Sequence, residues 1–258
     1  MSAREAANLA VVRRLEAAGF RAWPAHSVEY DGAWAIRLTP GHPAKRLNSV
    51  NPLDPGDVAD IDGRIARIAK HFDAAVRPLT FRLSPLAGAV LSRHLDAANW
   101  SSFDESMVMR LDLDRLDLGM AIDQIPLKDV RRFVTAALAV RGADRSLRAG
   151  LTGVIASIEP VAGLFVLESA ERPVATLISV HHRELAGLFE IATLAEEQRR
   201  GHARRLILSA LKWARQRGAY RGWLQVETAN AAALALYRSL GFREVYRYHY
   251  RRPAGAPT

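Results

Sequence analysis

The chain has 258 residues, of which 49% are hydrophobic and 24% charged, as in an ordinary globular protein. It contains no cysteine, which excludes disulfides, thiolate metal sites and a cysteine nucleophile. The net charge of +9 would suit a nucleic-acid binder, but the sequence has no helix-turn-helix, zinc-finger or low-complexity basic segment. We therefore expect no nucleic-acid partner, and attribute the charge to solvated arginines and to attraction of a polyanionic ligand.

The N-terminal segment reads as an amphipathic helix over residues 4–18, with Gly19 as its stop. It lacks the apolar core and the cleavage site of a signal peptide. No apolar run in the chain is long enough to span a bilayer. These features predict a cytoplasmic protein without a membrane partner.

A strand is predicted over residues 33–38, followed by a loop rich in proline and glycine over residues 39–56. The loop holds a cluster of polar side chains, Arg46, Asn48 and Asn51. Two interpretations stay open: asparagines that stabilise local turns, or a polar rim that contacts a substrate.

The next segment alternates helix, strand, helix and strand, and a further helix follows from Pro126 to about Arg141. Gly142 ends this last helix, and residues 142–150 are predicted as a flexible joint. The predicted ranges of the four alternating elements are 60–76, 79–83, 85–97 and 106–113.

Beyond the joint, strands are predicted over 163–168, 174–180 and 185–194. A basic turn and an amphipathic helix come next, then a strand over 223–228, a helix after Asn230 and a strand over 244–251. Antiparallel strands followed by strand–helix–strand–helix–strand predict a mixed α/β sheet.

The basic turn reads Gln198-Arg199-Arg200-Gly201-His202-Ala203. Glycine permits backbone angles that other residues resist, and a helix N-terminus offers free N–H groups and positive dipole charge to an anion. Four arginines add cations at this place. They are Arg199, Arg200, Arg204 and Arg205. The alternative is an ordinary turn with a solvated basic face.

The pattern Q-x-x-G-x-A in this turn, followed by N-x-x-A-x-x-L-Y-x-x-L-G-F over residues 230–242, resembles the GCN5-related N-acetyltransferase (GNAT) superfamily. The resemblance covers about residues 162–250. It implies that the turn binds the pyrophosphate of acetyl-CoA, and that the preceding strand pairs with the pantetheine arm. Leu194 becomes a candidate oxyanion donor through its N–H. The strand residues implied in cofactor binding are Ile191, Ala192, Thr193, Leu194 and Ala195.

The resemblance also assigns individual roles. Asn230 would contact the cofactor arm, although it is also a good helix N-cap. Tyr237 would be the general acid that protonates the CoA thiolate, with core packing as the alternative. Glu190 is the candidate base, Glu227 its rival, and an ordinary solvated carboxylate the alternative for both. No spacing of histidines and carboxylates predicts a metal site.

The first half of the chain parallels the second with an offset of 141 to 142 residues, so we expect two tandem GNAT-like lobes. The first lobe has lost the chemistry, because Asp60 stands opposite Gly201 and Leu95 opposite Tyr237. The predicted division is a degenerate lobe over 1–142 and a catalytic domain over 143–258.

These observations predict an acetyl-CoA-dependent N-acetyltransferase in which the acceptor attacks the thioester directly. The first expectation for the acceptor is the primary amine of a small molecule, bound between the lobes near Arg46, Asn48 and Asn51. An N-terminal or lysine acetyltransferase of proteins is the alternative, and a non-catalytic acyl-CoA-binding regulatory module is the alternative of another class.

Overall fold

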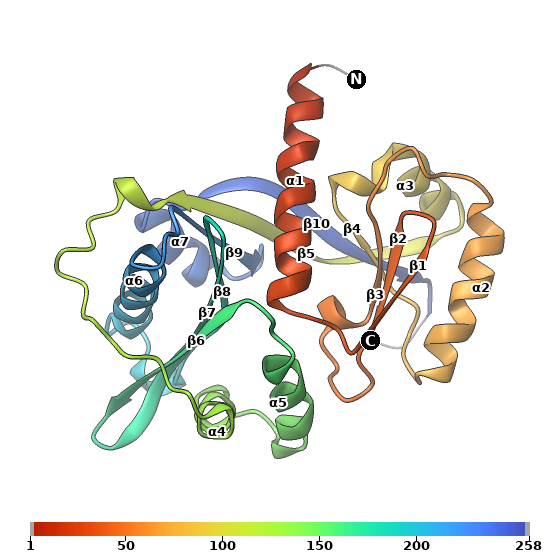
Figure 1. Ribbon diagram of the computed structural model, residues 1–258. Helices are drawn as coiled ribbons and strands as arrows, with labels where there is room; N and C mark the ends of the chain where they lie inside the picture. Colours follow the sequence, from red (N-terminus) through yellow and green to blue (C-terminus); the bar gives the residue numbers. More distant parts are fainter. Residues whose placement is uncertain (1–2, 256–258) are drawn as a thin grey trace.

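The computed structural model describes residues 3–255, whose strands form one ten-stranded mixed sheet (Figure 1). The strand order is β1-β2-β3-β4-β10-β5-β9-β8-β7-β6. Among the strand pairs of the described residues, only β3·β4 and β8·β9 are parallel. The strands are β1 (Ser27–Asp31), β2 (Trp34–Leu38), β3 (Ser49–Pro52), β4 (Phe81–Leu83), β5 (Trp100–Asp112), β6 (Val161–Ser169), β7 (Arg172–His182), β8 (Leu185–Thr193), β9 (Arg221–Glu227) and β10 (Arg243–Pro253).

The two halves of the chain repeat one order of elements, which confirms the expected tandem GNAT-like lobes. Each half runs through three strands, a helix, a parallel strand, a second helix and a last strand. The N-terminal lobe comprises β1–β4 with α2 (Ile61–Ala74) and α3 (Gly88–Ala97). The C-terminal lobe comprises β6–β9 with α6 (His202–Arg215) and α7 (Ala231–Ser239), among others.

The lobes exchange their last strands. β10 follows the C-terminal lobe in sequence but pairs with β4 of the N-terminal lobe, for example His249 with Leu83. β5 follows the N-terminal lobe but pairs with β9, from Ser106 with Glu227 to Asp112 with Arg221. The two exchanged strands then pair with each other along the middle of the sheet. One continuous sheet therefore joins both halves of the chain.

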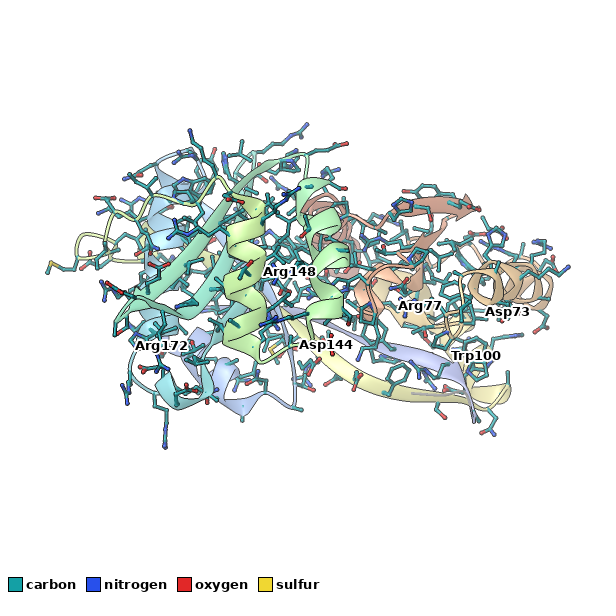
Figure 2. The ribbon with its side chains drawn as sticks, turned by 90° about the horizontal axis from the view of Figure 1, so that it is seen from below. Asp73, Arg77, Trp100, Asp144, Arg148 and Arg172 are labelled. Carbon is teal, nitrogen blue, oxygen red and sulfur yellow. The ribbon has the colours of Figure 1, made fainter. Side chains whose placement is uncertain are left out.

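The pictures show this exchange directly. In Figure 1, β5 and β10 run from one lobe to the other, and α1 (Ala3–Ala22) stands between the lobes. Figure 2 shows Trp100, where β5 begins, beside Arg77 and Asp73 of the N-terminal lobe, whereas Arg172 lies at the far side of the C-terminal lobe. No helix within residues 3–255 is long and apolar enough to cross a bilayer.

Helices cover both faces of the C-terminal lobe. Adjacent residues of β7 point to opposite faces, so that Leu177 packs with α6 while Ile178 packs with α4 (Val130–Arg141) and α5 (Arg148–Ala156). Because α4 packs against β6, β7 and β8, it favours a lobe boundary before Val130. The division between residues 142 and 143 itself stays a prediction.

A buried ion pair connects α1 with both lobes. Glu16 of α1 accepts hydrogen bonds from Arg82 of β4, one of them 3.0 Å long, and from the Tyr246 hydroxyl of β10 at 2.5 Å. Burial alone would lower the pKa of Arg82, but the charge and hydrogen bond of Glu16, together with Tyr248 and Tyr250, outweigh it and hold that pKa well above its usual value. We call these residues the Glu16–Arg82–Tyr246 triad.

Several elements depart from the expectations: α1 continues past the predicted stop at Gly19 to Ala22, and β5 begins at Trp100 rather than at residue 106. Strand β1 was not expected, and the predicted loop 39–56 contains the 3₁₀ turn Lys45–Leu47 and the strand β3. Strand β3 is short and ends at a proline, so its pairing with β2 and β4 stabilises it rather than its own propensity. The predicted joint 142–150 contains a 3₁₀ turn and the start of α5, whose glycines hid its helical pattern.

Candidate active site

Strands β8 and β9 diverge at the centre of the C-terminal lobe. They pair in parallel from Leu185 with Arg221 as far as Leu188 with Leu224, and no further. At this point Glu190 takes a left-handed conformation, with φ of 50°, and the register between β7 and β8 shifts. A bulge of this kind bends the strand. Beyond it, one edge of β8 is left without a partner strand, as pairing with an extended ligand requires.

The predicted cofactor strand, residues 191–195, lies along this gap. The N–H of Leu194, a candidate oxyanion donor, bonds instead to the carbonyl of Val174 at 2.9 Å. That expectation therefore does not fit the structure, because the donor is used within the sheet. Since neighbouring N–H groups of a strand point to opposite edges, the N–H of Thr193 is directed to the gap.

A cavity of about 420 Å³ opens beside the gap and is lined by both lobes. It brings together five of the predicted site residues, from the 3₁₀ turn before β3, from β8 and from α7. The lining residues that sequence reasoning did not assign to the site include Arg141, Gln225, Tyr248 and Tyr250. The predicted residues in the lining are Arg46, Glu190, Ile191, Asn230 and Tyr237.

Tyr237 lies on α7 with 6% of its surface exposed. Its ring packs edge-on to Phe242, and its hydroxyl forms no hydrogen bond with any residue between 3 and 255. Burial raises the pKa of Tyr237 to about 12, although the nearby charge of Arg141 acts in the opposite direction. The phenol is therefore protonated at neutral pH and able to donate a proton into the cavity. The core packing and the acid role expected for Tyr237 are compatible.

Glu190 forms an ion pair with Arg141 of α4, at 3.2 Å between Oε2 and Nη2. The bulge turns this carboxylate into the cavity, and 14% of its side chain is exposed. Arg141 gave no signal in the sequence beyond an ordinary basic residue in the last turn of a helix. Glu227, the rival carboxylate on β9, is exposed and forms no ion pair within the described residues.

Asn230 acts as the N-cap of α7, since its side-chain oxygen accepts a hydrogen bond from the N–H of Ala233 at 3.1 Å. The same residue lines the cavity. The capping interaction fixes the side chain at the mouth of the gap, so the cap does not exclude a contact with a ligand.

The basic turn enters α6 through Gly201, which has φ of 82° in the left-handed region. Space around this position is open, because a Cβ added at Gly201 would meet no atom within 4 Å. The first helical bond joins the N–H of Arg205 to the carbonyl of Gly201 at 3.0 Å. The N–H groups of residues 202–204 therefore precede the first helical bond and can face an anion.

Charges around the turn are partly balanced by Glu197, which binds Arg172, Arg200 and His202. The hydrogen bond from His202 contributes most to lowering the pKa of this carboxyl. Arg199 and Arg205 form no ion pair within residues 3–255, so their charges are available to a ligand at this turn.

The polar residues of the 39–56 segment lie in two different environments, one at the cavity and one within the local turns. Arg46 lines the cavity. The side chain of Asn48 donates to the carbonyl of His42 at 2.7 Å and accepts from the N–H of Thr39 at 2.8 Å. Asn51 is buried and donates to the carbonyl of Ser49 at 2.8 Å. These contacts favour the turn-stabilising interpretation of both asparagines, neither of which lines the cavity.

Comparison with known proteins adds to this geometry. Residues 9–251 match the family model described as "Probable histone acetyltransferase Rv0428c C-terminal". The chain is 23% identical over 248 residues to "Uncharacterized N-acetyltransferase YobR" of Bacillus subtilis, which spans 93% of this chain and 98% of that protein. It is 43% identical over 72 residues to the "[Ribosomal protein bS18]-alanine N-acetyltransferase" of Salmonella typhimurium, or 27% of this chain and 49% of that protein.

A solved GCN5-related N-acetyltransferase from Kribbella flavida shares the fold, with a TM-score of 0.70 at 19% identity over 95% of this chain and 96% of that chain. No group of three or more metal-binding side chains occurs in the part of the chain that the structure describes. The family model covers nearly all of the sequence, both lobes included. The chain therefore belongs to the family described as "Probable histone acetyltransferase Rv0428c C-terminal" and is an N-acetyltransferase of the GCN5-related superfamily.

Proposed function

We propose that this enzyme transfers an acetyl group directly from acetyl-CoA to the primary amine of a small molecule. The observation that carries the proposal is the cavity shared by the two lobes. It places a protonated tyrosine and two carboxylates beside the gap between β8 and β9. A thioester laid in that gap would meet both kinds of group at once.

The residues around the gap fit the chemical parts of acetyl-CoA. The free edge of β8 over residues 191–193 offers backbone groups to the amides of the pantetheine arm. The open turn at Gly201, with the free N–H groups of α6 and the charges of Arg199 and Arg205, offers a seat for the pyrophosphate. Asn230 stands at the mouth of the same gap. Together these features support acetyl-CoA as the acyl donor.

The reaction needs two proton transfers. The amine nitrogen attacks the thioester carbonyl carbon, the C–S bond breaks, and the CoA thiolate takes a proton. Tyr237 supplies this proton, because its raised pKa keeps the phenol protonated at neutral pH. The proton lost by the amine goes to Glu190 or Glu227, either directly or through water. Arg141 holds Glu190 at its position on the bulge.

A second acceptor class has its own support. The Salmonella typhimurium relative acts, by its name, on an alanine of a ribosomal protein, and similarity to it covers 72 residues. The α-amine of a protein is therefore the alternative acceptor. We favour a small molecule because the N-terminal lobe closes one side of the cavity with residues 44–46 and with Tyr250 of the exchanged strand β10.

The test is calorimetric titration with acetyl-CoA, followed by amine-dependent release of CoA from the intact enzyme. We expect saturable binding and CoA release with small primary amines. If acetyl-CoA binds but no small amine causes release of CoA, whereas a peptide N-terminus is acetylated, the protein acceptor would be favoured. Absence of acetyl-CoA binding would overturn the proposal.

A further inference from the structure

Apart from Arg141 of α4, which is paired with Glu190, the charges that line the cavity separate by lobe. The N-terminal lobe contributes cations, Lys45 and Arg46, from the 3₁₀ turn before β3. The C-terminal lobe contributes the carboxylates of Glu190 on β8 and Glu227 on β9. An acceptor that fills the cavity therefore meets a positive side and a negative side.

The cations that line the cavity differ in whether a carboxylate of the protein forms an ion pair with them. Lys45 is paired with Asp104, and Arg141 is paired with Glu190. Arg46 forms neither an ion pair nor a side-chain hydrogen bond with any of the described residues. Its guanidinium is thus the lining cation whose charge the protein leaves without an anion, although the side chain is only partly exposed.

The backbone of Arg46 is held in place. Its carbonyl accepts a hydrogen bond from the buried Arg37 at 2.8 Å, and Leu47 next to it is completely buried. Arg46 also lies close enough to Tyr250 for its charge to act on that hydroxyl, whose pKa burial raises well above its usual value. A guanidinium carried on a backbone held in this way can bind a carboxylate through two parallel hydrogen bonds.

The opposite side of the cavity suits an amine. Glu227 is exposed and without a cationic partner among residues 3–255, and Glu190 shares its charge with Arg141. Both carboxylates lie on the strands that border the gap, where the thioester would be placed. An amine next to them would be close to the acyl group and to a proton acceptor.

We propose that the acceptor is a small amino acid-type zwitterion, whose carboxylate binds Arg46 and whose amine lies between Glu190 and Glu227. This inference rests on the proposed function and deepens it, since it names the class of the small molecule. A simple alkylamine would leave Arg46 without an anion, and a diamine would place a second cation beside it.

The experiment uses the intact enzyme, acetyl-CoA and matched acceptors. The proteinogenic amino acids are tested beside the amines that remain when each loses its carboxylate, such as lysine with cadaverine and tyrosine with tyramine. CoA release gives kcat and KM for each acceptor. Charge-assisted bidentate bonds predict that at least one amino acid exceeds its matched amine about 10- to 100-fold in kcat/KM.

Variants of Arg46 separate recognition from folding. In Arg46→Gln this preference should fall about 10-fold or more, through a higher KM for the amino acid with little change in kcat or in acetyl-CoA affinity. Arg46→Lys should restore part of the preference. Arg215→Gln is the matched control, because Arg215 is exposed on α6 and forms no ion pair with the described residues.

The outcomes are distinguishable. Equal use of amino acids and matched amines, an unchanged preference in Arg46→Gln, or failure to acetylate any amino acid although acetyl-CoA binds would each overturn the zwitterion proposal. Acetylation of amines without a preference would leave the proposed function standing. Absence of acetyl-CoA binding would instead overturn the proposed function itself.

Discussion

In each lobe one helix begins directly after a residue in the left-handed conformation, but the side chains around that residue have opposite charges in the two lobes. Helices α2 and α6 both begin after a residue in the left-handed conformation, Asp60 with φ of 46° and Gly201 with φ of 82°. Around Gly201 the turn is basic and open. Around Asp60 it is acidic, and Arg67 pairs with it at 3.1 Å.

The lobes also differ in whether their charged groups surround an open cavity or bind one another. In the C-terminal lobe, β8 and β9 diverge and leave a cavity. In the N-terminal lobe, Arg64 binds Asp57 and Asp31, each at 3.0 Å, and its guanidinium lies 3.8 Å from the centre of the Trp34 ring. At this place the charges of the N-terminal lobe are balanced by one another. One copy of the fold therefore has an open gap between its parallel strands, while the other supplies one wall of the cavity beside that gap.

The largest effect is expected where the lobes are joined, in the Glu16–Arg82–Tyr246 triad. Arg82→Leu leaves the buried Glu16 without its cation, which should lower the free energy of unfolding by about 3–5 kcal/mol. Urea denaturation measures this change. The double variant Glu16→Leu/Arg82→Leu should recover much of the loss, because it removes both buried charges. A single variant within about 1 kcal/mol of the unchanged protein would contradict the interpretation.

The two lobes also differ at the position of Tyr237, because the corresponding residue in the N-terminal lobe is the buried Leu95. Tyr237→Phe should lower kcat at least about 10²-fold while acetyl-CoA affinity stays within about 2-fold, because only the proton donor is lost. Steady-state kinetics and calorimetry measure the two quantities. Tyr220→Phe, at an exposed tyrosine, is the control and should change neither.

The pH profile sharpens this prediction. A general acid acts while protonated, so activity is lost as pH rises through its pKa. Because burial raises the pKa of Tyr237 to about 12, this group should cause no loss of kcat between about pH 7 and pH 10. A decline in that range that disappears in Tyr237→Phe would show that the tyrosine ionises too early for the assigned role.

The basic turn is tested by a pair of substitutions. Gly201→Glu should weaken acetyl-CoA binding about 10- to 100-fold, because it brings a negative charge to the anion site and strains a left-handed residue. Gly201→Ala carries the strain alone and should weaken binding less. Asp60→Asn in the other lobe should leave binding unchanged. Equal losses in the Glu and Ala variants would indicate that backbone strain, rather than charge, controls the site.

The smallest effect concerns two helix caps. Asn230→Ala removes the cap of α7, and Ser84→Ala removes the cap of the 3₁₀ turn Pro85–Ala87 that leads into α3, where the Ser84 hydroxyl accepts from the N–H of Leu86 at 3.2 Å. Each should lower the free energy of unfolding by about 1 kcal/mol. Only Asn230→Ala should also weaken acetyl-CoA binding if its side chain contacts the cofactor. Calorimetry and thermal denaturation of both variants provide the measurements.

Much of this fold could be predicted from periodicity, since α2, α6 and the strands of the C-terminal lobe have strong apolar patterns. The strand exchange could not be predicted, because β5 and β10 alternate in the same way and either could pair with β4 or β9. Strand β3 was missed since its stability comes from its partners rather than from its own residues.

The residues of the site also differ in whether the sequence alone could reveal them. Tyr237 and the turn at Gly201 belong to two short motifs that the sequence displays directly, and Glu190 lies on the strand just before that turn. Arg141 could not be recognised, because its pairing with Glu190 depends on how α4 packs on the sheet. Asn48 and Asn51 were open to two interpretations, since hydrogen bonds to local carbonyls leave no mark in a single sequence.

The exchange of the last strands also governs how the chain can fold during synthesis. Strand β10 ends at Pro253 and pairs with both β4 and β5, which the ribosome releases more than a hundred residues earlier. Until β10 emerges, β4 and β5 each present an unsatisfied edge, and unsatisfied edges attract other chains. The first lobe is therefore completed only after β10 has been synthesised, and cutting the gene between the lobes would release two halves that each lack a strand.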